Sequence, residues 1–403
     1  MMEKVGKYIT NYIKGKTPKV LLSSEETDAL PYLSPDYLRG VASPEVYAKQ
    51  DTKSIVVDDG EVIVLWDGSN AGEILISKKG VLASTMTMLQ FDEKQIDKAY
   101  FGYSFQNLEY ILKAKTAGSG IPHADKGVIS KLEFYKPSLA EQSAIAAMLS
   151  KVDEAIAAVQ ASISAAERLK KSLMQNLLTG RMKPDGTLRK EDEFYVDEKF
   201  GRVPLGWEVK AIGDKDVCKI NPVYKYKKKE VYDFIPMEAI KENFEGVDYV
   251  EKQVIDNGSY TRFKAGDILF AKITPCSENG KVAYIDHIDS EVGFASTEFI
   301  VFHPTENVDG KYVYLLLSSG NVHRLAISLM EGTTGRQRIP WKIFRNRIFV
   351  PMPDKVEQTI IVDKILAFDK QIKENNNKIA VLERLKKSLM QNLLTGRVRV
   401  LFE

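Results

Sequence analysis

The segment "NPVY", Asn221 to Tyr224, contains residue types that could act on a DNA base. The polar atoms of an Asn-Pro box can hold the amino group of a flipped base while an aromatic ring stacks on it, as adenine methylation requires. Such an enzyme also needs a glycine-rich strand-to-helix turn for S-adenosylmethionine, and the sequence has none before Asn221 or after it. An adenine-N6 DNA methyltransferase therefore remains an alternative that rests on four residues.

Four other segments place basic residues beside polar or aromatic ones. Lys and Arg can neutralise phosphates, whereas Arg and Gln on a glycine-flanked loop suit bidentate contacts to guanine and adenine. In "YKYKKKE" and "GTTGRQRIPWKIFRNR" the candidate DNA contacts are Tyr224, Lys225, Lys227, Lys228, Lys229, Arg336, Gln337, Arg338 and Lys342. In "KGKTPK" and "TAGSGIPHADK" they are Lys14, Lys16, Thr17, Lys19, Ser119, His123 and Lys126. For any one segment alone, an ordinary solvated surface is the alternative explanation.

The composition excludes several other function classes. Residues 1–136 hold 17 Lys and Arg against 18 Asp and Glu, and residues 203–352 hold 20 against 20, so bulk charge gives DNA binding no support. The sequence has no GxxxxGK[ST] phosphate loop, and its four histidines and two cysteines lack metal-ligand spacing, so neither an ATP-driven motor nor a metal site is expected. Isolated cysteines and the lack of any apolar run of roughly 20 residues predict a cytoplasmic protein without membrane spans.

An identical 15-residue segment, "ERLKKSLMQNLLTGR", occurs at residues 167–181 and again at 383–397. At the same offset of 216 residues, scattered matches extend the repeat back to Pro137 and Pro353. Each copy begins with a capping-box pattern, Ser138 with Glu141 and Asp354 with Glu357, and ends at a glycine suited to a left-handed C-cap.

Between these ends, apolar residues recur at alternating steps of three and four, which predicts two long helices that pair through a heptad seam. The seam residues are Ile145, Leu149, Val152, Ile156, Val159, Ile163 and Ala166 in the first copy, and Ile361, Ile365, Phe368, Ile372, Asn375, Ile379 and Leu382 in the second. A three-residue step to Leu169 and to Leu385 is expected to disturb the supercoil. Asn375 is either a register-setting residue or a tolerated polar one.

The remaining sequence predicts two strand-rich domains that echo each other. "GEVIVLWDGSNAG" parallels "GDILFAKITPCSENG", "GVLASTM" parallels "GFASTEF", and "GSGIPH" parallels "GRQRIPW" in the same order. The expected organisation is a domain at 1–136, a helix at 137–181, a linker at 182–202, a domain at 203–352, a helix at 353–397 and a tail at 398–403.

With the helix pattern "EQ…LERLKKSLMQNLLTG", these motifs resemble the specificity subunits of type I restriction–modification systems. "FGRVPLGWE" at Phe200 and "ENGK" at Glu278 belong to the same resemblance, although domain 1–136 has no counterpart of "GRVPLGWE". The resemblance implies an α+β protein with two target-recognition domains, separated by an antiparallel coiled coil of the two helices in a pseudo-twofold internal repeat. It implies a non-catalytic chain that reads a bipartite double-stranded DNA target, one domain per half-site.

The resemblance also implies protein partners. Two modification (methyltransferase) subunits would bind this chain, restriction (motor–nuclease) subunits would complete the enzyme, and S-adenosylmethionine, ATP and magnesium would belong to those partners. Identical surface residues in both helices suit two identical partners, although a recent duplication of DNA would also produce them. The candidate partner contacts are Arg168, Lys171, Met174, Gln175, Leu178, Arg384, Lys387, Met390, Gln391 and Leu394. A coiled-coil scaffold with two protein-binding heads is the alternative from another functional class.

Overall fold

The computed structural model describes residues 1–49, 51, 54–116, 122–256, 259–333 and 335–400. The chain divides into two compact units, of which unit 1 comprises Met1–Ser162 with Asn375–Glu403 and unit 2 comprises Ile163–Glu374. The division falls inside both long helices. Each unit therefore contains one strand-rich region, part of one long helix and part of the other.

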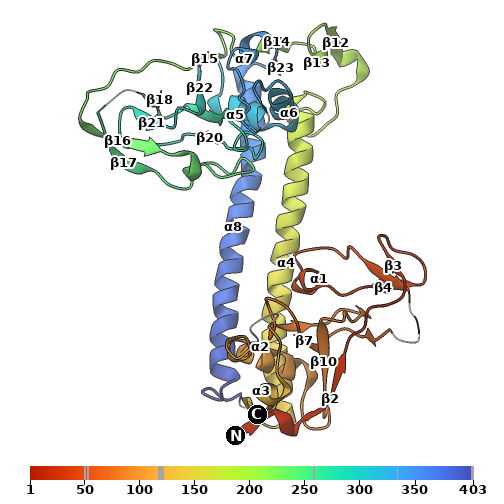
Figure 1. Ribbon diagram of the computed structural model, residues 1–403. Coiled ribbons are helices and arrows are strands. Elements are labelled where there is room, and N and C mark those ends of the chain that lie inside the picture. The colour runs from red at the N-terminus through yellow and green to blue at the C-terminus, as the bar shows by residue number, and fades with distance from the viewer. Residues whose placement is uncertain (50, 52–53, 117–121, 257–258, 334, 401–403) are drawn as a thin grey trace. The chain divides into compact units, whose positions relative to one another are not determined.

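Unit 1 is built around a four-stranded sheet with the strand order β2-β10-β7-β8 (Figure 1). Helix α2 packs its buried aromatic residues, including Tyr100 and Phe101, into the core beside this sheet. The elements of the strand-rich region are β1 (Met2–Lys4), β2 (Ile9–Lys14), β3 (Leu21–Leu22), β4 (Ala29–Pro31), α1 (Pro35–Arg39), β5 (Tyr47–Lys49), β6 (Val56–Val57), β7 (Val62–Leu65), β8 (Ile74–Ile76), β9 (Gly80–Val81), β10 (Met86–Phe91), α2 (Lys98–Ala114), α3 (Lys126–Lys131) and β11 (Glu133–Tyr135).

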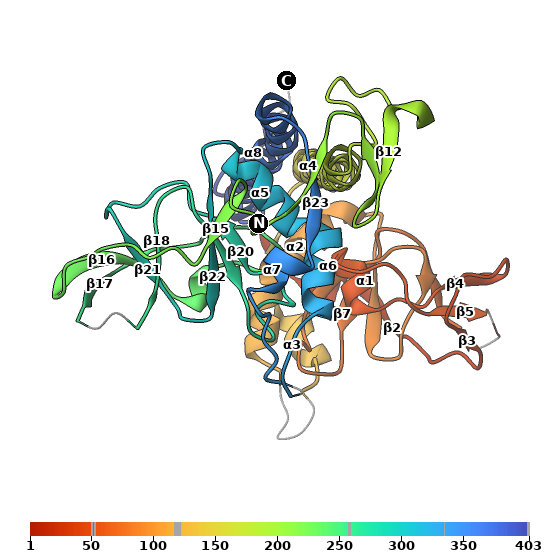
Figure 2. The same cartoon turned by 90° about the horizontal axis from the view of Figure 1, so that it is seen from above.

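Unit 2 contains a four-stranded sheet of matching strand order, β15-β22-β19-β20, and a second sheet, β17-β16-β21-β18, which lies farther from helix α8 (Figure 2). Its elements are β12 (Phe194–Asp197), β13 (Gly201–Pro204), β14 (Glu208–Ala211), β15 (Cys218–Ile220), β16 (Glu230–Ile235), β17 (Glu251–Ile255), β18 (Thr261–Phe263), β19 (Ile268–Ala271), β20 (Val282–Tyr284), β21 (Gly293–Ala295), β22 (Phe299–Pro304), α5 (Gly310–Ser318), α6 (Gly320–Ser328), α7 (Ile343–Asn346) and β23 (Phe349–Met352).

Long helices occur where the sequence predicted them, as α4 (Leu139–Leu178) and α8 (Lys355–Leu393). Within unit 1 the beginning of α4 lies beside the end of α8, because Ile145 and Leu393 share one core and Lys386 pairs with Asp153 at 2.7 Å. Asn375 donates to the Ser162 hydroxyl at 3.3 Å, so this half-buried polar residue has a polar partner on the facing helix.

Within unit 2 the end of α4 lies beside the beginning of α8 in the same way. Leu177 and Ile361 belong to one core, and Lys170 forms an ion pair with Asp369. Lys170 and Asp369 correspond to Lys386 and Asp153 of unit 1 at the repeat offset of 216. The matched lysines and aspartates of the repeat therefore bind helix to helix in each unit.

The disturbance of the seam that was expected at Leu169 and Leu385 is wrong. Leu169 is 51% exposed and Leu385 is 46% exposed, so neither leucine continues the apolar contact between the helices. Burial instead continues at Leu173 and Leu177, which follow Ala166 by 7 and 11 residues. The heptad spacing of the seam therefore continues from Ala166 through Leu173 to Leu177, whereas Leu169 and Leu385 face solvent.

The capping-box predictions are half right. Ser138 and Asp354 do accept hydrogen bonds from the Glu141 and Glu357 amides, at 3.3 and 2.9 Å. The glutamate side chains, however, bind elsewhere. Arg399 binds the Glu141 carboxylate through two nitrogens at 2.7 and 2.8 Å, and this hydrogen bonding lowers the pKa of Glu141.

In unit 2 the equivalent glutamate is less buried than Glu141, but the arginine that pairs with it is more enclosed. Glu357 accepts from Arg189 at 2.7 Å and from the Trp207 indole at 3.0 Å, and Arg189 also donates to the carbonyl of Gly180. Trp207 lies in the "GRVPLGWE" segment that the first domain lacks. Arg399 of the tail in unit 1 and Arg189 of the linker in unit 2 thus have the same role, because each binds the glutamate in the first turn of a long helix.

The glutamines of the repeated Glu-Gln pair fasten each strand-rich region to its helix. Gln142 is fully buried, accepts from the Asp97 amide at 2.9 Å and donates to the Pro137 carbonyl at 3.0 Å. Gln358 repeats both bonds with Asp309 and Pro353, each at 2.8 Å. Because Asp97 and Asp309 are the N-caps of α2 and α5, one side chain ties two helix beginnings together.

Arg189→Ala is expected to destabilise unit 2 by about 2–4 kcal/mol, because it removes a nearly buried guanidinium together with its hydrogen bonds to the Glu357 carboxylate and to the Gly180 and Met182 carbonyls. The Arg189 side chain is only 10% exposed, whereas that of Arg399 is 61% exposed. Arg399→Ala, the matched variant, should lower the thermal midpoint less, because water can take the place of this exposed guanidinium beside the Glu141 carboxylate. Thermal unfolding of both variants measures the difference, and equal midpoints would contradict the account of this contact.

Candidate nucleic-acid interface

In unit 1, three strand ends bring the candidate contacts of the first domain to one end of the sheet. Strand β2 ends at Lys14, β7 ends at Leu65, and β10 begins at Met86, with Lys14 opposite Thr87 and Leu65 opposite Met86. The chain segments that continue from these ends carry Lys14, Asp67 and Thr17. We call this edge the sheet end of unit 1.

Asp67 joins two of the predicted contacts at this sheet end. Its carboxylate lies 3.0 Å from the Lys14 ammonium and 2.6 Å from Nδ1 of His123, and the backbones of Asp67 and His123 form a bridge. Partial burial would raise the pKa of Asp67, but the hydrogen bonds from His123 and Lys14 outweigh it and lower that pKa. Asp67 is therefore ionised at neutral pH and holds two groups that sequence alone could not place together.

Aromatic rings lie next to this cluster. The Tyr12 ring meets the Trp66 ring edge to face, 6.1 Å between centroids, and the Lys126 ammonium lies 4.9 Å from the Tyr12 centroid. Thr17 donates to the hydroxyl of Ser84 in the "ASTM" segment at 3.2 Å. Lys16 and Lys19 are exposed, with no ion pair among the described residues, and Ser119 lies outside the described residues.

Unit 2 has the equivalent sheet end, where β15 ends at Ile220, β19 ends at Ala271 and β22 begins at Phe299. Arg338 bridges by its backbone to Ile273, just beyond β19. Its guanidinium binds the Glu298 carboxylate through Nε and Nη2, both at 3.1 Å, and this hydrogen bonding lowers the pKa of Glu298. Arg336 is exposed, Gln337 is half-buried, and Lys342 is exposed one residue before α7.

A hollow of about 270 Å³ lies at this sheet end, and three of its lining residues are candidate DNA contacts that the sequence did not indicate. Lys272, Arg262 and Tyr260 line it together with Asn221 and Thr297. Arg262 lies over the Tyr226 ring at 4.5 Å and donates to the Tyr224 carbonyl at 2.7 Å. Their only signal in the sequence was isolated basic or aromatic residues near a motif, which did not distinguish them from surface residues.

The "NPVY" residues serve the fold. Asn221 has a positive φ of 49° and exchanges hydrogen bonds with the backbone of Val301, and Tyr224 donates its hydroxyl to the fully buried Asp267 at 2.9 Å. Burial raises the pKa of both Tyr224 and Asp267, so the phenol keeps its proton. The Asn221 side-chain oxygen and the Tyr224 hydroxyl are thus both bonded within the protein, whereas Lys225, Lys227, Lys228 and Lys229 are exposed.

The echo between "GSGIPH" and "GRQRIPW" is misaligned by three residues in the sequence comparison. The letters match Pro122 with Pro340, but the backbone bonds make His123 the counterpart of Arg338. Ala124 donates to the Trp66 carbonyl as Ile339 donates to the Lys272 carbonyl, at 2.9 and 2.8 Å, and Trp66 and Lys272 each directly follow the third strand of the sheet order.

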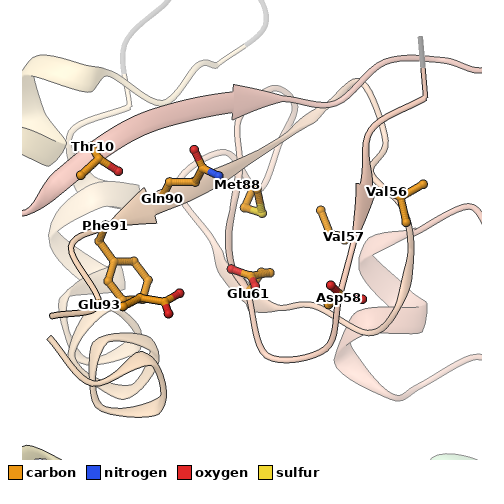
Figure 3. Close-up of a pocket in the computed structure, with 9 residues that line it drawn as sticks. All are labelled: Thr10, Val56, Val57, Asp58, Glu61, Met88, Gln90, Phe91 and Glu93. Atoms are coloured by element: carbon orange, nitrogen blue, oxygen red, sulfur yellow. The ribbon is translucent and has the colours of Figure 1, made fainter. Parts of the chain in front are cut away.

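A hollow of about 350 Å³ lies at the other end of the unit 1 sheet and has the opposite charge (Figure 3). Asp58, Glu61 and Glu93 surround it, and Glu61 is paired with Lys98. Carboxylates in this arrangement would repel DNA phosphates, so the sheet end with Lys14 is the better candidate.

The candidate partner surface of the repeated segment needs one correction. Leu178 and Leu394 are each 4% exposed and pack into the cores of units 2 and 1, so they cannot contact a partner. Met174 and Met390 are half-buried. The remaining candidates are exposed: Arg168, Lys171, Gln175, Arg384, Lys387 and Gln391.

Comparison with known proteins assigns a family to this arrangement. The profile of the type I restriction modification DNA specificity domain matches residues 7–168 and 204–384. The specificity subunit of the type I restriction enzyme MjaVIII from Methanocaldococcus jannaschii is 31% identical over 98% of this chain and 92% of its own length. The EcoEI specificity subunit from Escherichia coli is 34% identical over 41% of this chain and 28% of its own.

Solved structures agree in fold. The S subunit of a type I restriction–modification system from M. genitalium matches with a TM-score of 0.58 at 14% identity, over 98% of this chain and 96% of that one. A chain from a structure of type I system assembly matches with a TM-score of 0.52 at 13% identity, over 99% and 98%. The chain belongs to the family of type I restriction–modification specificity subunits.

Among the described residues, no helix is both long and apolar enough to cross a bilayer.

Proposed function

We propose that this chain reads a bipartite DNA target, with one half-site bound by residues 1–136 and the other by residues 203–352, and that it catalyses no reaction itself. The observation that carries the proposal is the repeated sheet end. The two units have sheets of matching strand order, and at the same end of each sheet an exposed basic side chain pairs with a carboxylate. These pairs are His123 with Asp67 and Arg338 with Glu298. Side chains held in this way suit base edges, and the lysines around them suit phosphates.

The paired helix segments supply the spacing between the half-sites. The α4 and α8 segments pair with opposite directions inside each unit, and the Lys–Asp ion pair recurs at the repeat offset. We infer one antiparallel coiled coil with pseudo-twofold symmetry, made from helix segments 137–181 and 353–397, with 182–202 as a linker and 398–403 as a tail.

Two modification subunits bind the repeated helix surface, and restriction subunits join through them. The 15-residue identity presents the same exposed Arg, Lys and Gln side chains twice, as two identical partners would require. S-adenosylmethionine, ATP and magnesium belong to those partners in the cytoplasm. A scaffold with two protein-binding heads would have the same helices, but it would not need basic side chains at both sheet ends.

DNA binding at several salt concentrations separates the two functions. A DNA reader loses affinity steeply as salt rises, because its cations release condensed counterions from the phosphates. A scaffold would bind DNA weakly at every salt concentration. The full chain with its modification subunits is the sample to measure, on duplexes from the host genome, and binding that does not change with salt would contradict the proposal.

Leu169→Glu combined with Leu385→Glu is expected to abolish binding of both modification subunits. These leucines are exposed at matched positions of the repeat, where a partner would bury them. Each single variant should retain one subunit, and mass measurement of the purified complex counts them. Val381→Glu is the matched control, since Val381 is 54% exposed on α8 outside the identical segment. Two bound subunits in the double variant would remove these leucines from the interface.

A further inference from the structure

The backbone gives His123 and Arg338 equivalent places in the two domains. His123 lies between α2 and α3 in the sequence, and Arg338 lies between α6 and α7. Each bridges the residue two positions after the end of the third strand in the sheet order, Asp67 after β7 and Ile273 after β19. The equivalence rests on hydrogen bonds and not on letters, since the sequence echo paired His123 with Trp341. The same backbone frame therefore carries two different side chains.

A carboxylate holds each of these side chains, although it comes from a different strand in each unit. Asp67 extends from the segment after β7, whereas Glu298 directly precedes β22. The side-chain exposures are 23% for Asp67 and 27% for Glu298, against 56% for His123 and 51% for Arg338. The carboxylate is thus more buried than the nitrogen group it holds, so the nitrogen group and not the carboxylate would meet the DNA.

The donors that remain on Arg338 suit a guanine. A guanidinium has five N–H groups, and Glu298 takes one on Nε and one on Nη2. The remaining groups, on Nη1 and the outer side of Nη2, form a second flat edge. That edge matches the O6 and N7 acceptors of guanine in the major groove, and the rotamer is already fixed before DNA binds.

His123 offers one ring nitrogen in place of an arginine edge. With Nδ1 on Asp67, the polar atom that His123 can offer to DNA is Nε2. Lys14 shares the same carboxylate from the other side at 3.0 Å, so both groups are fixed relative to each other. The two domains would therefore read different bases from one backbone frame.

We propose that His123 and Arg338 are the matched specificity-determining residues of the two domains, with Asp67 and Glu298 as the positioning residues that hold them. The inference rests on the proposed function, because it assumes that the two sheet ends face DNA. Arg336, which is exposed and unpaired among the described residues, would contact phosphate in contrast.

The test uses the full chain in complex with its modification subunits, after the target of the wild-type complex has been mapped. Dissociation constants are measured for the target and for every single base-pair change in both half-sites. Glu298→Gln and Arg338→Lys should each reduce discrimination by about tenfold at one base pair of one half-site, since a good bidentate contact is worth roughly that or more. Asp67→Asn and His123→Ala should do so at one base pair of the other half-site only.

Matched controls separate positioning from charge and from folding. Glu208→Gln and Asp36→Asn remove exposed carboxylates that pair with Lys210 and Arg39 in the same units, and they should leave discrimination unchanged. Arg338→Lys keeps the positive charge, so it decides the matter if Glu298→Gln fails to fold. Uniform weakening on all sequences, or unchanged discrimination in Arg338→Lys and His123→Ala, would overturn the inference. A wild-type complex without a bipartite target would instead overturn the proposed function.

Discussion

Replacing residues 1–136 with the first domain of another specificity subunit should change one half of the DNA target and leave the other half unchanged. The cluster of Lys14, Asp67 and His123 lies wholly within the replaced segment, and the cluster around Arg338 lies wholly outside it. The expected effect is a complete change of one half-site, since each mismatched base pair costs roughly 1–3 kcal/mol and a half-site contains several.

The replacement must keep the contact that fastens the domain to α4. The incoming domain needs an aspartate at the N-cap of its α2 equivalent, because Gln142 accepts from the Asp97 amide and Ser143 donates to the Asp97 carboxylate at 2.8 Å. The reciprocal replacement of residues 203–352 is the matched control and should change only the other half-site. Methylation mapping of host genomes carrying each hybrid reads both outcomes. A change in both half-sites from one replacement would mean that the domains do not read independently.

Deleting one heptad from each long helix should shorten the gap between the half-sites or prevent specific binding. The loss of seven residues removes ~10 Å at ~1.5 Å per residue. That length equals about three base pairs of duplex, and it turns one half-site relative to the other by nearly a third of a helical turn. Each half-site should keep its own bases, because both sheet ends remain intact.

The position of the deletion decides whether the units survive. Ile145, Leu149, Ile361 and Ile365 are fully buried in the cores of their units, so a deletion that begins at residue 145 or 361 would remove core residues. Deleting residues 156–162 and 372–378 is the better choice, because none of these residues belongs to those cores. This deletion also removes Asn375 together with its hydrogen-bond partner Ser162. Deleting 156–162 alone is the control and should break the helix register. Methylation at the original spacing by the double deletion would show that the helices do not set the distance.

The sequence predicted the helices well because their signals are local. A proline, a capping residue and a terminal glycine mark each helix, and Gly180 and Gly396 adopt the expected left-handed φ of 68° and 72°. Burial of Ile145, Leu149, Ile361 and Ile365 follows from the same spacing. These features depend on residues a few positions apart, which a sequence displays directly.

The errors concern contacts between distant residues. Glu141 meets Arg399, 258 residues later, and no local pattern distinguishes that contact from a capping box. Leu178 and Leu394 were assigned to a partner surface because one helix does not show which of its apolar residues the attached domain covers.

The candidate site was found only in part for the same reason. Asp67 is 56 residues from His123, and Glu298 is 40 residues from Arg338, so the carboxylates that hold the two side chains gave no signal in the sequence. The letters of the echo also matched Pro122 with Pro340, which hid the equivalence of His123 and Arg338.

Methylation mapping is the most direct test of whether this chain determines a bipartite DNA target. The chain and its modification subunit would be expressed in a bacterial host without other type I enzymes, and every methylated position in the genome would be determined by long-read sequencing. We expect one methylated motif of two short defined half-sites separated by a gap of fixed length and free sequence, and we expect this motif to disappear when the chain is omitted. A continuous motif without a gap, or the same motif in the absence of this chain, would contradict this expectation.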